Sequence, residues 1–260
     1  MSNSTLAIIN SRNRLPESLS SSNFSYNIGS AIEIQELAVK SVSLPNTAYN
    51  INENNNKINF IYNGTTYSRA IANGQYNVST LTTALIAAVA NATGNPTALT
   101  SIIENPITGK LKYTFDQPTQ IYVSGVFVLM GFNIQINTFY PAVATNVINS
   151  PTLPNLQGSM NYYLASRTLA QGTNALLFNA VRNLAIFAVI PNNVPFGSVI
   201  QYVPSDILLD LKLFASKQNI QQIDVVVLDT EFNVVDLNGA EIELCFKCYI
   251  KARVEQFGVK

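Results

Sequence analysis

The stretch that decides the fold runs from Glu241 to Val254 and reads Glu241-Ile-Glu-Leu-Cys-Phe-Lys-Cys-Tyr-Ile-Lys-Ala-Arg-Val254. Its even-numbered positions are all apolar, whereas most of its odd-numbered positions are charged. Successive side chains of a β-strand point to opposite faces, so this alternation predicts one long strand with a buried face and a wet face. Such a strand is typical of an antiparallel sheet that is covered on one side.

Other candidate strands precede this one, separated by turn clusters rich in Asn, Gly and Pro. Ile223 to Asp229 is apolar enough to be a strand, and the tight-turn sequence Asp236–Gly239 leads into the last strand, which predicts a carboxy-terminal hairpin. The remaining candidates are Glu33 to Leu44, Lys57 to Tyr62, Thr66 to Ile71, Lys110 to Phe115, Gln120 to Val123, Tyr162 to Ser166, Asn183 to Val189 and Val199 to Tyr202.

One helix is predicted within Val78 to Ala92, with Asn77 or Ser79 as its N-cap and Gly94 just beyond its end. The apolar positions that share a face of this helix are Leu81, Leu85, Ala88 and Val89. A second helix is one interpretation of Ser205 to Lys217, where the alternation also permits a strand. We find no internal repeat.

The composition excludes several classes of function. Lys plus Arg number 15 and Asp plus Glu also 15, with no basic cluster, which disfavours binding to a nucleic-acid backbone. The chain has no His, so it lacks the commonest general base and metal ligand, and it has no Gly-rich phosphate loop. We predict no enzymatic activity, no catalytic, cofactor-binding or metal-binding residue, no cofactor and no transmembrane segment.

Cys245 and Cys248 form a CxxC sequence, which elsewhere can bind a metal or act as a redox pair. Residues three apart on a strand point to opposite faces, so we expect that these two thiols cannot meet. Two cysteines also cannot form a disulfide framework, and the amino terminus does not read as a secretion signal, so we expect a protein kept in a reducing compartment.

Charge is distributed unevenly along the chain. No charged residue occurs between Arg69 and Glu104, between Asp116 and Arg167, or between Arg182 and Asp206. Loops normally lie on the surface, so these intervals predict a neutral, partly apolar exterior of the composition found at interface cores. Residues 1–22 are predicted to be a flexible arm, because the polar run Ser11 to Ser22 shows no periodicity. Two interpretations of the arm stay open: a frayed terminus, or a tail that orders against a partner through the apolar piece Leu6 to Ile9. The interface candidates are Leu6, Ile8, Ile9, Phe139, Tyr140, Leu153 and Leu156.

Several segments, in this order, resemble the penton protein of virophages and related polinton-like viruses, a single-jelly-roll minor capsid protein. They are Leu37 to Ile51 with the strand Lys57 to Ile61, Ile71-Ala-Asn-Gly-Gln-Tyr76 with the following helix, Thr108 to Tyr113, Leu129-Met-Gly-Phe132, Ser150 to Asn155 with the strand near Tyr162, and Asp236–Gly239. The resemblance covers roughly residues 25–254. The chain lacks the Trp residues that many members carry, and no inserted domain is visible in its sequence.

The resemblance implies an all-β fold, namely a single eight-stranded antiparallel jelly-roll β-sandwich with one or two short helices in loops, occupying residues 23–260. It also implies a penton subunit whose homo-pentamer closes the icosahedral five-fold vertices. Its partners would be the double jelly-roll major capsid protein and other minor capsid proteins, with no specific nucleic acid. The location would be the virion, at capsid vertices, after synthesis in the host cytoplasm or viral factory.

Two alternatives remain open from the residues. A trimeric jelly-roll fibre head or receptor-binding module of a virion would share the alternation and the low charge. A β-sandwich enzyme that uses paired carboxylates is the other, and it is disfavoured because the carboxylates are scattered along the chain.

Overall fold

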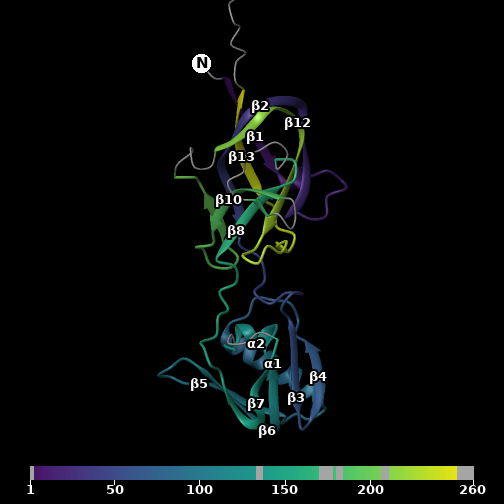
Figure 1. Cartoon of the computed structure of the whole chain (residues 1–260), viewed down its shortest axis with the longest axis vertical. Coiled ribbons are helices and arrows are strands. Elements are labelled where there is room, and N and C mark those ends of the chain that lie inside the picture. Colours follow the sequence, from purple (N-terminus) through teal and green to yellow (C-terminus); the bar gives the residue numbers. More distant parts are fainter. Residues whose placement is uncertain (1–2, 133–136, 170–177, 180–183, 206–210, 251–260) are drawn as a thin grey trace, which may run out of the picture. The chain divides into compact units, whose positions relative to one another are not determined.

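The computed structural model describes residues 3–132, 137–169, 178–179, 184–205 and 211–250 (Figure 1). The chain forms two compact units: unit 1 contains Met1–Ala48 and Ser159–Lys260, and unit 2 contains Tyr49–Gly158. Among the described residues every strand pairing is antiparallel and helices are few, so the predicted all-β antiparallel class is confirmed.

Unit 1 is an 8-stranded sheet in the order β1-β13-β2-β12-β8-β10-β9, with β11 paired to β2. Its elements are β1 (Asn3–Asn10), a 3-10 turn η1 (Ser11–Asn13), β2 (Asn23–Pro45), β8 (Asn161–Ser166), β9 (Phe178–Asn179), β10 (Leu184–Pro191), β11 (Val199–Tyr202), β12 (Leu211–Leu228) and β13 (Glu243–Ile250).

This sheet folds back on itself into a sandwich. The ring of Phe187 on β10 lies 5.5 Å from that of Phe246 on β13, although β2, β12 and β8 separate these two strands in the sheet order. The long strands β2 and β12 (Figure 1) pair with register shifts, and such irregularities allow strands to turn a corner between two layers. One core is therefore enclosed, with Phe24, Leu44 and Leu244 among its fully buried side chains.

The last strand behaves as its alternation predicts. Ile242, Leu244, Phe246 and Cys248 are buried, whereas Glu243 is exposed. Residues 251–254 of the predicted strand lie outside the described residues. Most other predicted strands lie largely within observed ones. The two predicted strands Lys110 to Phe115 and Gln120 to Val123 fall, except for Lys110 and Val123, in the single strand β6. The alternative helix at 205–217 is wrong for Leu211 to Lys217, which belong to β12.

Unit 2 is a 5-stranded sheet in the order β4-β3-β6-β5, with β7 paired to β6, together with the helix α1. Its elements are β3 (Lys57–Tyr62), β4 (Thr65–Ala70), α1 (Val78–Thr93), β5 (Leu99–Glu104), β6 (Leu111–Tyr122), α2 (Val126–Leu129) and β7 (Phe139–Asn149). The helix prediction is confirmed: Asn77 caps α1, Gly94 ends it in a left-handed conformation, and its buried residues are Leu81, Leu85, Ala88 and Val89.

The second unit corrects the expectation of one domain over residues 23–260 without an insertion. Residues 49–158 enclose a separate core around Phe60, Leu85 and Tyr113, which shares no residue with the core of unit 1. The sequence did not predict this boundary, because no linker-like composition marks either end of the insertion. The chain reaches unit 2 directly after β2 and leaves it directly before β8.

Two motifs of the resemblance contact each other inside unit 2. Gly131 accepts hydrogen bonds at its carbonyl from the backbone and side chain of Thr152, both at 3.0 Å, and Asn155 donates its N–H to Leu129 at 2.7 Å. A Cβ added to Gly131, whose φ is +94°, would lie 2.4 Å from the Thr152 oxygen. Glycine is required here both by the backbone conformation and by the close approach of the segment that contains Thr152.

We predict that Gly131→Ala lowers the free energy of unfolding by about 3 kcal/mol, because backbone strain and a steric clash add. The matched control is Gly64→Ala, at φ +76° with no atom within 4 Å of the added Cβ, which carries the conformational cost alone. Urea unfolding followed by circular dichroism measures both variants. Equal losses would show that the contact with Thr152 is not tight.

Candidate interaction surfaces

The amino-terminal segment is part of the sheet, which corrects the expectation of a flexible arm over residues 1–22. β1 pairs with β13 along its whole length, from Asn3 opposite Ile250 to Asn10 opposite Glu243. Ile9 is fully buried in the core of unit 1. The sequence signal was lost because the partner strand lies more than 200 positions away and the apolar run Leu6 to Ile9 shows no alternation.

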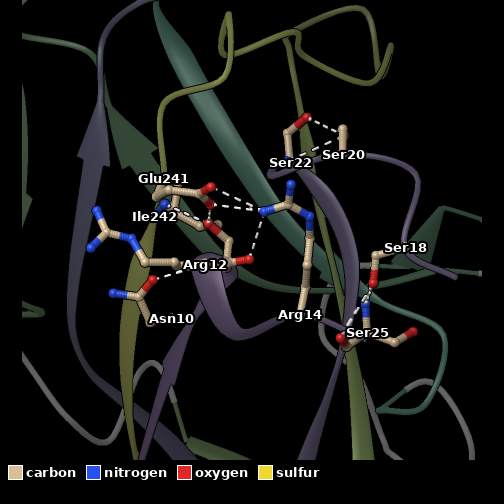
Figure 2. Close-up of polar contacts among 10 residues, drawn as sticks. Asn10, Arg12, Arg14, Ser18, Ser20, Ser22, Ser25, Glu241 and Ile242 are labelled. Atoms are coloured by element: carbon tan, nitrogen blue, oxygen red, sulfur yellow. Dashed lines mark hydrogen bonds and ion pairs between the residues drawn. The ribbon is translucent and has the colours of Figure 1, made fainter. Parts of the chain in front are cut away.

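A polar cluster holds the end of β1 in place (Figure 2). Ser11 is fully buried, exchanges hydrogen bonds with the backbone of Ile242 at 2.9 Å, and donates its hydroxyl to the Glu241 carboxylate. Arg14 donates from Nη1 to Glu241 Oε1 at 3.0 Å and to the carbonyl of Ser11 at 2.8 Å. These bonds connect the segment after β1 to the two residues just before the last strand, β13.

The cluster changes the titration of its carboxylate. Partial burial by itself would raise the pKa of Glu241, but the Ser11 hydroxyl and the Arg14 guanidinium stabilise the charged form, and the net pKa is lowered. A carboxylate with a lowered folded-state pKa stabilises the fold at pH values above its unfolded pKa, and this stability is lost as the pH falls through the folded pKa.

We predict that Glu241→Gln lowers the free energy of unfolding at neutral pH by about 1 kcal/mol, because the pair with Arg14 is partly exposed and one acceptor remains for Ser11. The variant should also lose less stability than wild type on acidification. Urea unfolding at a series of pH values from about 7 to about 3 measures both effects. Glu231→Gln, in an exposed turn, is the control, and parallel pH profiles for wild type and Glu241→Gln would contradict the prediction.

The interface candidates of unit 1 divide into two groups. Leu6 and Ile8 on β1 are each 60% exposed and stand on the outer face of the sheet. Ile9 points to the opposite face and is 0% exposed, so in this fold it supports β1 rather than meeting a partner.

The candidates of unit 2 divide in the same way. Phe139 on β7 and Leu153 in the following loop are exposed, whereas Tyr140 and Leu156 are half-buried and pack against the core of unit 2. The Tyr140 ring lies 5.9 Å from that of Phe132. Within the described residues β7 pairs only with β6, so this uncharged strand forms an edge of the sheet.

Other exposed apolar side chains were not among the candidates. Val199 on β11 and the adjacent Val203 are 46% and 66% exposed, and Ile107 in the turn between β5 and β6 is 92% exposed. The charge-free interval from Arg182 to Asp206 was the available signal for the first two. Ile107 lies in a five-residue turn flanked by charged residues, so a search for long uncharged intervals could not identify it.

The CxxC sequence lies as expected. Cys245 is half-buried, Cys248 is buried, and both are free thiols. Burial, with a smaller contribution from Cys245, raises the pKa of Cys248 to about 11, which keeps it a thiol at neutral pH. No group of three or more metal-ligating side chains occurs among the residues that the structure describes. In that same part of the chain, no helix has the length and hydropathy needed to cross a bilayer.

The fold and these surfaces define an antiparallel β-sandwich protein that carries a second, inserted unit and presents uncharged apolar strands to the outside. No protein-family model matches the chain, and no curated protein matches its sequence. Among solved structures, the chain is similar to the crystal structure of the selenomethionine-labelled mavirus penton protein. The two chains share 12% sequence identity with a TM-score of 0.48 over 95% of this chain and 100% of that chain.

Proposed function

We propose that this protein is a structural capsid protein, a penton subunit whose homo-pentamer closes the icosahedral five-fold vertices. The observation that carries the proposal is the exposure of large apolar side chains on uncharged strands and loops of both units. Interfaces are depleted in charge and enriched in aromatic residues at their centres, whereas free surfaces of soluble proteins rarely show this composition over long intervals.

The interval between Asp116 and Arg167 illustrates this composition. It contains β7 and the loop after it, and no position within it is charged. The exposed fractions of its large apolar side chains are Phe139 41%, Val143 79%, Val147 40%, Leu153 57% and Met160 65%. A subunit covered on several sides by neighbours needs such broad neutral edges rather than a reactive cleft.

The proposed partners are other copies of this chain, the double jelly-roll major capsid protein and other minor capsid proteins, with no specific nucleic acid. The proposed location is the capsid vertex of the virion, after synthesis in the host cytoplasm or viral factory. Leu6, Ile8, Phe139 and Leu153 are the interface residues retained from the sequence, since their side chains are exposed. The ordered set of penton-like segments supports the same role.

We predict that native mass spectrometry of the full-length chain detects a species of five times the 28.4 kDa subunit mass. Electron-microscopy class averages of that species should show five-fold rings. A stable trimer would contradict the penton and favour the fibre-head alternative, whereas turnover in a broad substrate screen would revive the enzyme alternative.

A further inference from the structure

Four strands of unit 1 lie side by side, with β1 and β11 at the two edges. The pairings Asn10 with Glu243, Glu243 with Ser43, and Ser43 with Gln201 form one row across β1, β13, β2 and β11. Asn10 Nδ2 donates to Glu243 Oε2 at 3.3 Å, and Gln201 Nε2 donates to Ser43 Oγ at 3.2 Å. These side chains therefore share the outer face, while the adjacent row with Leu244 and Val42 faces the core.

On this outer face the apolar side chains lie on the edge strands and the polar ones on the central strands, which is the reverse of the usual pattern of a sheet. The edge strand β1 exposes Leu6 and Ile8, and the edge strand β11 exposes Val199. The central strands carry the polar groups, among them Glu243 and Lys247. In natural sheets, charged side chains on an edge strand prevent it from pairing with a strand of another molecule. Neither β1 nor β11 contains a charged residue.

The edge strand β4 of unit 2 provides an internal comparison. It exposes Arg69 and otherwise mainly small polar side chains, which is the ordinary protection of an edge. Within the described part of the chain, β1 pairs with β13 alone and β11 with β2 alone. Among the described residues, no other strand pairs with the outer side of β1 or with that of β11 at Val199, Ile200 and Gln201, so a further strand could add along each.

The topology also sets the relative direction of the two edges. β1, β13, β2 and β11 are successively antiparallel, so β1 runs parallel to β2, and β11 runs opposite to both. When copies of this sheet follow one another in the same orientation around an axis, β11 of one copy meets β1 of the next in antiparallel sense. This is the geometry in which strands pair across subunits in a continuous sheet.

We propose that β1 of one subunit pairs with β11 of the next, so that Leu6 and Ile8 pack beside Val199 and Val203 of the neighbour. The occupant of each edge is a second copy of this chain because the two edges match in charge, apolar character and direction. The contact joins two different surfaces, and such head-to-tail contacts generate rings when the rotation closes. This inference rests on the proposed pentamer and names the surface that builds it.

Two matched variants place lysines on one edge each. The β1-edge variant carries Leu6→Lys and Ile8→Lys, and the β11-edge variant carries Val199→Lys and Val203→Lys. The control carries Leu19→Lys and Val234→Lys, at positions of unit 1 that are 83% and 38% exposed and lie on neither edge. All replaced side chains are exposed on the outside, and thermal unfolding verifies that each variant is folded.

Native mass spectrometry should find pentamers for wild type and control, with the pentamer fraction of each edge variant reduced about tenfold or more. A mixture of the two edge variants should form 1:1 dimers, because each supplies the intact edge that the other lacks. Pentamers from either edge variant, or a mixture that stays monomeric, would overturn the edge pairing and leave the penton proposal standing. A wild-type chain that forms no pentamer would contradict the proposed function itself.

Discussion

The architecture of unit 1 depends on the hydrogen bonding of β2, because this strand has neighbours along both of its sides. β13 pairs with one side, while β12 and then β11 pair with the other. Leu37, Val39 and Leu44 of β2 are buried in the core between the layers. Without this central strand β13 would have no register, and β1, which pairs with β13, would have no position in the sheet.

Features encoded locally could be predicted from the sequence. Alternation predicted the last strand. The N-cap, the apolar face and the glycine beyond the end predicted α1. Both signals arise within a few residues and reflect the burial of one side of one element. The same alternation predicted that Cys248 faces the core, where it is buried, whereas Cys245 is only half-buried.

Features that depend on distant partners could not be predicted in this way. β1 is a strand because it pairs with β13, and no pattern in the sequence around Leu6 predicts that pairing. The inserted unit could not be predicted from the sequence. Its residues join a different core from that of the flanking residues, but their composition is the same. For the interface candidates, the run Leu6 to Ile9 concealed which side chains face the core, and only the register with β13 separates Ile8 from Ile9.

Surface polarity and edge position together distinguish the apolar residues that build the core from those left outside. Tyr140 and Leu156 are half-buried in unit 2, so their apolar character has an internal explanation. Leu6, Ile8 and Val199 have no such explanation among the described residues, because their side chains stay 60%, 60% and 46% exposed there. An assembly that covers them accounts for side chains that the isolated fold does not use.

The insertion has a consequence for the order in which the protein folds. Unit 2 is built from one contiguous segment, whereas unit 1 joins the first residues of the chain to the last ones, as in the pairing of β1 with β13. During synthesis, β2 emerges long before β12 and β13, and its apolar face must wait for them. A unit 2 that folds early replaces about a hundred residues of loose chain with a short compact bridge, which reduces the entropy lost when the two parts of unit 1 meet.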